Sequence, residues 1–408
     1  MDLNFTEEQS MLQKTARNFF EKEFTFDLVN EEQHSIISKH SADVWKKISD
    51  MGWLGVVIDE QYGGIGGSLF DLGIIYEEAG RALLPTTFYS TVYASLLIEQ
   101  LGNEEQKESI LSQIVEGSIM GTIAFAEPDA INKPEYFQTT AKKLQDRWVL
   151  NGTKAFVSNA DTADIILVIA RKEDDSRGEG LMTFIVRPED HGVTLKSMNT
   201  FGNDSQSVVN FNNIELDDSK VLGDGIEQTE TIAQSIEIAR KKATALQCME
   251  MAGGARKVLD MTVDYVSERK QFGVPIGSFQ AVQHHLANML AEVEGSQLAS
   301  YQAIWMLSEG LEAEQELAIA KAFVSETYKS TTLMAHQLWA GMGFALDSGL
   351  YLYSNRSKAT ELSFGTYDYH LKRLSELITP VKETLKVKSE NSNLYRNTIF
   401  RKIDIYDV

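Results

Sequence analysis

Residues 267–280 read Ser-Glu-Arg-Lys-Gln-Phe-Gly-Val-Pro-Ile-Gly-Ser-Phe-Gln, and this stretch separates two long helical patterns. Apolar residues recur at helical spacing over 229–268 and again over 281–308, while two glycines and a proline break the pattern between them. A third helical pattern covers 314–338. Long apolar helices joined by short breaks predict a helical bundle, whose interior can hold a ligand or cofactor.

The middle of the chain has a different period. Between about 118 and 222, short β-type runs at 165–170, 182–186 and 208–216 are separated by turn-forming residues. Residues 148–157 predict a hairpin with a tight turn at Asn151-Gly152. Before residue 117 the apolar spacing is helical, apart from the glycines of 63–67, which predict a turn.

The expected fold is therefore mostly α with an antiparallel β insert. These changes of pattern predict an N-terminal helical domain at 1–117, a middle β domain at 118–226 and a C-terminal helical bundle at 227–381. A charged, weakly periodic tail follows at 382–408.

Composition excludes several classes of function. The 408 residues include 59 acidic and 38 basic side chains, a net charge of −21, which is the wrong sign for a nucleic-acid binder. The longest largely apolar stretch, 82–98, is interrupted by Pro85 and several hydroxyl side chains, so no membrane span is expected. A single cysteine, Cys248, and a start without signal-peptide features predict a cytoplasmic protein. His284 and His285 are adjacent on a predicted helix and cannot chelate one metal together, so no metal site is expected.

Two segments contain candidate functional residues. Arg269 could bind a phosphate and Phe272 offers an aromatic face, although basic residues at a helix end also serve as a C-cap. Glu250 is the only charged residue between Lys242 and Arg256. Burial would raise its pKa and make it a general base, or it is a structural residue hydrogen-bonded to a neighbouring helix. The adjacent residues Gly253-Gly254 predict close helix packing.

The sequence resembles the acyl-CoA dehydrogenase family over nearly its whole length. The similar segments are Phe5-Thr-Glu-Glu-Gln, Met51-Gly-Trp-Leu-Gly, Gly63-Gly-Ile-Gly, Tyr76-Glu-Glu-Ala-Gly-Arg81, Glu127-Pro128, Leu150–Asn159, Phe211-Asn-Asn-Ile, Glu268–Gly273, Phe279-Gln280 and His336–Phe344. They occur in the order of the family's N-terminal, middle and C-terminal domains. The resemblance implies FAD as cofactor, an acyl-CoA substrate and electron-transfer flavoprotein as acceptor. It also implies a homotetramer or a heteromer of related chains.

The resemblance also implies roles for individual residues. Arg269, Phe272 and Gln280 match residues that contact the FAD of a neighbouring subunit, and Gln337 and Gly341 match residues at its pyrophosphate and adenosine. Phe156 and Ser158 match the residues beside the flavin ring, and Thr366 matches a threonine near the cofactor phosphates.

The sequence departs from the family where the α-proton base is expected. Phe364 stands where many members carry a glutamate, in a loop that is one residue shorter, and Ala243 falls on the earlier position used by other members. Asp129-Ala-Ile-Asn replaces a glycine- and serine-containing turn at the substrate. The pattern resembles a bacterial branch that includes subunits of heteromeric steroid-side-chain dehydrogenases.

Three hypotheses follow from the resemblance: an active acyl-CoA dehydrogenase with an unusual base, a non-catalytic partner chain, or a flavin monooxygenase of the same fold. For the first, Glu250 is the leading catalytic candidate. It lies seven residues from Ala243, which is two helical turns on the same face. Glu361 and Asp368, which flank the loop at Phe364, are the other candidates.

Overall fold

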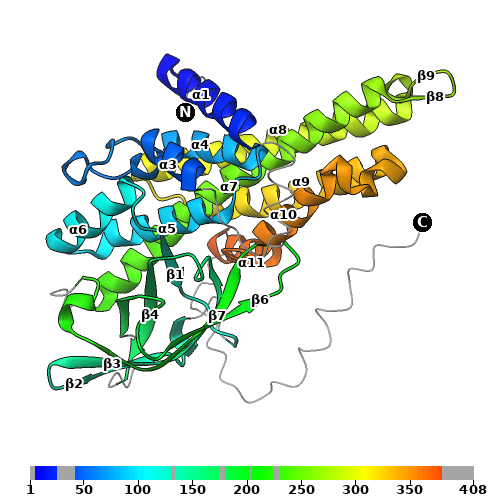
Figure 1. Cartoon of the computed structure of the whole chain (residues 1–408). Helices are drawn as coiled ribbons and strands as arrows, with labels where there is room; N and C mark the ends of the chain where they lie inside the picture. Colours follow the sequence, from blue (N-terminus) through cyan, green and yellow to red (C-terminus); the bar gives the residue numbers. More distant parts are fainter. Residues whose placement is uncertain are drawn as a thin grey trace, which may run out of the picture.

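The computed structural model describes residues 5–24, 42–129, 134–173, 180–202, 204–223 and 229–378. Figure 1 shows two groups of elements, a long assembly of helices and a β-sheet that lies against one side of it. The predicted mostly-α fold with a β insert is confirmed. The predicted tail at 382–408 lies outside the described residues, and the predicted domain boundaries stay a prediction.

The N-terminal region is helical. Its helices are α1 (Glu7–Glu23), α3 (Ala42–Asp50), α4 (Leu69–Arg81), α5 (Thr86–Leu101) and α6 (Glu104–Val115). Capping boxes begin three of them, at Thr6, Ser68 and Asn103. The predicted turn at 63–67 is present, and Gly63 and Gly66 adopt left-handed backbone angles there.

The β domain is one seven-stranded sheet. Its strands are β1 (Gly121–Ala124), β2 (Thr140–Leu144), β3 (Arg147–Ser158), β4 (Ile165–Lys172), β5 (Leu181–Val186), β6 (Val193–Met198) and β7 (Gln206–Leu216). The order is β1-β4-β2-β3-β7-β6, with β5 paired to β4. Because β4 runs parallel to both β1 and β2, the sheet is mixed rather than wholly antiparallel.

Strand β4 joins the two halves of the molecule. Ile165, Leu167 and Ile169 on one face belong to the core shared with the helices. The alternate residues of β4 pack into the separate core of the β domain. A strand buried on both faces reads as a continuous apolar run, which is why 165–170 was recognisable in the sequence.

The predicted hairpin at 148–157 is wrong, because these residues form one strand, β3. Asn151 and Gly152 lie where the pairing of β3 with β7 shifts register, and Gly152 has a φ of 147°. The Asn151 side-chain oxygen accepts a hydrogen bond from the backbone N–H of Asn213 at 2.8 Å. The hairpin turn lies instead at 145–146, between β2 and β3, with Gln145 at a φ of 57°. A glycine in a strand marks a bulge as readily as a turn.

The C-terminal region is the predicted helical bundle. It contains α7 (Thr229–Glu268), α8 (Gln280–Ser308), α9 (Glu314–Trp339), α10 (Leu350–Leu362) and α11 (Tyr367–Ile378). The segment quoted first forms the ribbon of β8 (Lys270–Gln271) and β9 (Val274–Pro275) at the far tip of the α7–α8 pair. Short 3-10 turns at 340–344 and 346–348 connect α9 to α10.

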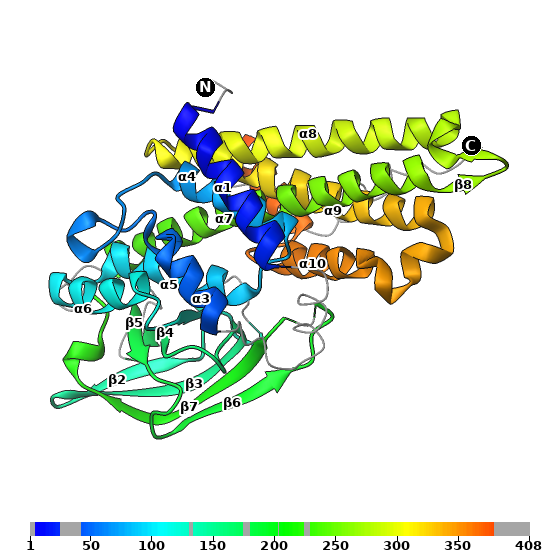
Figure 2. The ribbon, with the colours of Figure 1, turned by 45° about the horizontal axis from the view of Figure 1, so that its top comes forward.

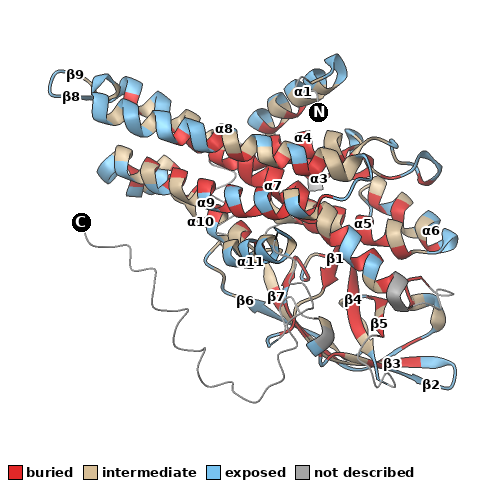
Figure 3. Ribbon diagram, turned by 180° about the vertical axis from the view of Figure 1, so that it is seen from behind, coloured by how far each residue is buried: buried red, intermediate tan, exposed pale blue. Residues whose placement is uncertain are grey.

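Helix α7 is the central helix of the molecule, and much of it is buried (Figure 3). It packs against α4, α5, α8, α9 and α10. A Cβ atom on Gly253 would clash with the carbonyl oxygen of Glu77 on α4, and one on Gly254 would clash with the hydroxyl of Tyr328 on α9. The close packing predicted for these two glycines is therefore confirmed. Among the described helices, none has the length and apolar character needed to cross a bilayer.

Candidate active site

Glu250 forms a buried ion pair with Arg356. Its Oε1 accepts a hydrogen bond from Arg356 Nε at 2.7 Å, and only 4% of Glu250 is exposed. Arg356 lies on α10 and also donates to the backbone carbonyl of Leu84, between α4 and α5. The pair therefore ties α7, α10 and the α4–α5 connection together. Burial raises the pKa of Glu250, while the charge of Arg356 opposes that rise.

This geometry agrees with the structural alternative for Glu250, a hydrogen bond to a neighbouring helix. A carboxylate held by an arginine is a weaker base than an unpaired buried one, because the pair stabilises its charged form. The catalytic role of Glu250 stays a prediction. Glu361 pairs with Lys358 at 2.6 Å, and Asp368 is exposed in the first turn of α11.

Aromatic and cationic side chains lie near Phe364 and Ala243, the two positions that the resemblance matches to the α-proton base. Phe364 has a φ of 55°, and its ring meets the ring of Tyr93 on α5 edge-on, with 5.2 Å between centroids. Arg240, one turn before Ala243 on α7, donates to the hydroxyl of Tyr369 at 3.1 Å. Neither Ala243 nor Phe364 can accept a proton.

A buried lysine supports the loop that contains Phe364. Lys321 on α9 is fully buried and donates to the carbonyl of Thr360, in the last turn of α10, at 2.5 Å. Burial lowers the pKa of Lys321 to about 8. The sequence reasoning missed both Lys321 and Arg356. A lone lysine in the apolar run Leu317–Val324 was a usable signal, whereas Arg356 stands in a polar stretch and gave none.

The candidate cofactor residues fall into two groups. Phe156 and Ser158 lie at the end of β3, where 45% of Phe156 is exposed and the carbonyl of Ser158 accepts from the Thr122 hydroxyl at 2.6 Å. Thr366 begins α11, and its hydroxyl accepts from the backbone N–H of Tyr369 at 3.2 Å. Phe156 and Ser158 thus belong to the sheet, and Figure 1 shows α11 close to the sheet.

The second group lies at the other end of the bundle. Arg269 and Phe272 are at the tip of the α7–α8 pair, and Gln280 begins α8. Gln337 is near the end of α9, and Gly341 lies in the 3-10 turn that follows it. All five are exposed. Figures 1 and 2 both show this tip pointing away from the β domain. One chain therefore does not bring the two groups together.

The chemistry of the second group fits a nucleotide cofactor bound at a contact with another chain. The guanidinium of Arg269 forms no ion pair with any described residue, and Phe272 is 94% exposed. A Cβ on Gly341 would meet no atom within 4 Å. A guanidinium without an ion pair among the described residues suits a phosphate, and the exposed ring of Phe272 offers an apolar face to a ligand.

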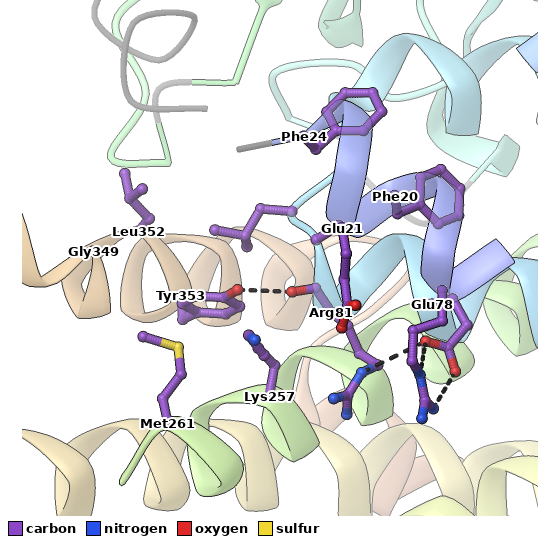
Figure 4. Close-up of a pocket in the computed structure, with 13 residues that line it drawn as sticks. Phe20, Glu21, Phe24, Glu78, Arg81, Lys257, Met261, Gly349, Leu352 and Tyr353 are labelled. Carbon is purple, nitrogen blue, oxygen red and sulfur yellow. Dashed lines mark hydrogen bonds and ion pairs between the residues drawn. The ribbon is translucent and has the colours of Figure 1, made fainter. Parts of the chain in front are cut away.

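A cavity of about 330 Å³ lies elsewhere, between α1, α4, α7 and α10 (Figure 4). Lys257 and Met261 line it from α7, and Tyr353 lines it from α10. Lys257 is seven residues beyond Glu250, and none of the candidate cofactor residues contributes to the lining. This cavity is therefore separate from the candidate active site.

Three family models match the chain in order. They are the N-terminal domain of acyl-CoA dehydrogenase at 6–118, the middle domain at 122–218 and the C-terminal domain at 241–378. The chain belongs to the acyl-CoA dehydrogenase family. The family resemblance read from the sequence is therefore confirmed.

Known proteins of this family resemble the chain over nearly its full length. A probable acyl-CoA dehydrogenase, YngJ of Bacillus subtilis, is 28% identical over 374 residues, which is 90% of this chain and 96% of that protein. Butyryl-CoA dehydrogenase from Megasphaera elsdenii superimposes with a TM-score of 0.85 at 27% identity, covering 93% of this chain and all of that chain. A variant of the Tcur3481-Tcur3483 steroid acyl-CoA dehydrogenase gives a TM-score of 0.80 at 28% identity, and the match covers 91% of this chain and 98% of that chain.

Titles of other structures with this fold name cofactors and partners. One describes PigA with FAD and proline, and at 24% identity it shows the fold alone. Another describes an electron-transferring flavoprotein of Acidaminococcus fermentans. These statements concern those proteins.

Proposed function

We propose that this chain is a FAD-binding subunit of an enzyme that removes the α and β hydrogens of an acyl-CoA thioester. The observation that carries the proposal is the exposed set at the bundle tip, where Arg269 forms no ion pair with the residues that the structure describes and Phe272 is 94% exposed. Family membership supports an oxidoreductase acting on acyl-CoA.

The FAD site would be assembled from two chains. Phe156 and Ser158 of one chain would lie beside the flavin ring, with Thr366 near the phosphates. The rest of the FAD molecule would be held by residues of the neighbouring chain, namely Arg269, Phe272, Gln280, Gln337 and Gly341. When bound, FAD accepts the β hydrogen as hydride. Arg269 would donate a charge-assisted hydrogen bond to a phosphate oxygen of FAD, and the ring of Phe272 would pack against an aromatic ring of FAD.

We further propose that a second, related chain supplies the α-proton base. Ala243 and Phe364 cannot take a proton, and Glu250 is held by Arg356. The matched steroid acyl-CoA dehydrogenase is named for two different chains, which supports a heteromer here. Glu250 acting as an unusual base in a homotetramer is the competing proposal. Electron-transferring flavoprotein is the proposed acceptor, because a structure described as an electron-transferring flavoprotein of Acidaminococcus fermentans resembles this chain.

The test is an anaerobic titration followed by the flavin absorbance. The protein is produced alone and, separately, co-expressed with a candidate second chain of the same family, and each sample is mixed with a panel of acyl-CoAs. We expect a yellow protein in which acyl-CoA bleaches the flavin only when the second chain is present. Bleaching of the single chain by acyl-CoA would contradict the division of roles. A colourless protein that takes up no added FAD in either sample would refute the proposed function.

A further inference from the structure

The cavity between α1, α4, α7 and α10 is lined by none of the candidate cofactor or catalytic residues. Its volume of about 330 Å³ falls within the range of small-molecule sites, which is about 300–1,000 Å³. Much of its wall is apolar and buried, because α1 contributes Phe20 and Phe24 while α10 contributes Leu352 and Tyr353 (Figure 4). Such a wall suits a ligand with an apolar body.

One cation that lines the cavity has no counterion among the described residues. Arg17 donates two hydrogen bonds to the carboxylate of Glu78, at 2.7 and 2.9 Å. Arg81 pairs with Asp260 at 2.9 Å. Lys257, in contrast, forms no hydrogen bond or ion pair with any residue that the structure describes, and its side chain points from α7 into the cavity (Figure 4). The ammonium group of Lys257 is therefore available to an anion.

The environment of the charged lining residues favours a negative ligand over a positive one. Glu21 also lines the cavity, from α1, but it is exposed, so water and salt screen its charge. Lys257 is half-buried beside apolar side chains, where the attraction between opposite charges is screened less. The cavity thus combines one unpaired positive charge with an apolar wall.

The wall on the α4 side is held in a defined shape. Helix α4 ends in a Schellman-type turn, in which the backbone N–H of Leu84 donates to the carbonyl of Ala79 at 3.0 Å. Leu83 has a φ of 55° in this turn, where glycine is the favoured residue, and its side chain lines the cavity. The hydroxyl of Tyr353 donates to the carbonyl of Arg81 at 2.7 Å and so holds α10 against the same turn. These contacts organise the wall before any ligand binds.

We propose that this cavity is an accessory binding site for a small carboxylate with an apolar body. The carboxylate would accept a charge-assisted hydrogen bond from the ammonium group of Lys257, and the apolar body would pack against Phe20 and Tyr353. This inference goes beyond the proposed acyl-CoA function and does not depend on it, because the two sites share no lining residue.

The test compares three ligands that differ only in their terminal group, namely phenylbutyrate, phenylbutanol and phenylbutylamine. Their dissociation constants are measured by calorimetry on the full-length protein as purified. Lys257→Met removes the charge and keeps the length of the side chain, and Ala82→Phe fills the cavity beside Leu83. The control is Lys372→Met, at an exposed lysine on α11 that does not line the cavity.

We expect the wild type to bind phenylbutyrate at least about ten times more tightly than the alcohol or the amine. Lys372→Met should keep this ratio, Lys257→Met should reduce it to about one, and Ala82→Phe should weaken phenylbutyrate binding at least about tenfold. Melting curves without ligand show whether each variant folds, and a variant that does not fold leaves the other to decide. Absence of phenylbutyrate binding, equal or tighter binding of the alcohol or the amine, a ratio that survives in Lys257→Met, or unchanged binding by Ala82→Phe would each overturn the site.

Discussion

Replacing Glu250 with glutamine separates the structural role of this residue from a catalytic one. The variant keeps the shape of the side chain and an oxygen that can accept from Arg356 Nε, but it removes the negative charge. Arg356, whose side chain is 10% exposed, then becomes a buried cation without its anion. Removing one partner of a buried ion pair lowers the free energy of unfolding by about 3–5 kcal/mol. Because glutamine keeps the hydrogen bond to Arg356, we expect a loss at the lower end of that range.

The expected result is a loss of about 3 kcal/mol in the free energy of unfolding of the helical region. A domain of this size melts about 2–4 °C lower per kcal/mol, so the melting temperature should fall by about 10 °C. The double variant Glu250→Leu with Arg356→Met removes both charges and should recover much of the loss, since apolar replacements of a buried pair are often neutral or better. Calorimetry on the three proteins, with flavin content measured for each, gives the result.

Flavin reduction by acyl-CoA is the second measurement on Glu250→Gln. A structural role predicts an unchanged rate per bound flavin in whatever assembly is active. If the variant instead melts like the wild type, keeps its flavin and reduces it about a hundred times more slowly, Glu250 is the base and the reasoning from its pairing with Arg356 is refuted.

Three further predictions concern other residues. Arg269→Ala should lower the flavin-to-protein absorbance ratio of the purified protein, because it removes a charge-assisted bond to the cofactor. The control Lys270→Ala, at the neighbouring exposed residue, should leave the ratio unchanged. Lys321→Met should show a pH-dependent difference from the wild type in chemical unfolding. The folded pKa of Lys321 is about 8, below its unfolded value, so the unfolded wild type binds more protons between pH ~8 and ~10.5 and the wild type gains stability relative to the variant as pH rises through that window. A difference that stays constant across that range would contradict the lowered pKa. Gly253→Ala should destabilise the protein although alanine favours helices by about 1 kcal/mol, because its Cβ would clash with the Glu77 carbonyl, and a higher melting temperature would disprove that close contact.

The parts of the fold that could be predicted are those that local sequence determines. The apolar spacing of 229–268, 281–308 and 314–338 corresponds to α7, α8 and α9, since a buried helical stripe needs that period. The hairpin at Asn151-Gly152 failed because the same dipeptide serves a turn and a bulge, and only the pairing with β7 distinguishes them. The parallel pairing of β4 is also a long-range property that no local pattern encodes.

Long-range contacts also limited the prediction of the site. Glu250 was recognisable as a lone charge in an apolar helix, but its partner Arg356 is 106 positions away in a stretch that reads as an ordinary polar helix. The cofactor residues were assigned by resemblance to family motifs and not from contacts within this chain. Their roles therefore stay proposals.

Two largely buried cations each donate a hydrogen bond to a backbone carbonyl in the helical region that contains Ala243 and Phe364. Arg356 fixes the carbonyl of Leu84 before α5, and Lys321 fixes the carbonyl of Thr360 just before the loop of Phe364. Burying the charge of an arginine or a lysine costs free energy of desolvation unless its hydrogen bonds are made. These contacts offset part of that cost and hold the two segments in place. A chain that needed only a stable bundle could fill the same space with apolar side chains at no greater cost. These charged contacts therefore fit the proposal that this chain shapes an acyl-CoA site while another chain provides the carboxylate.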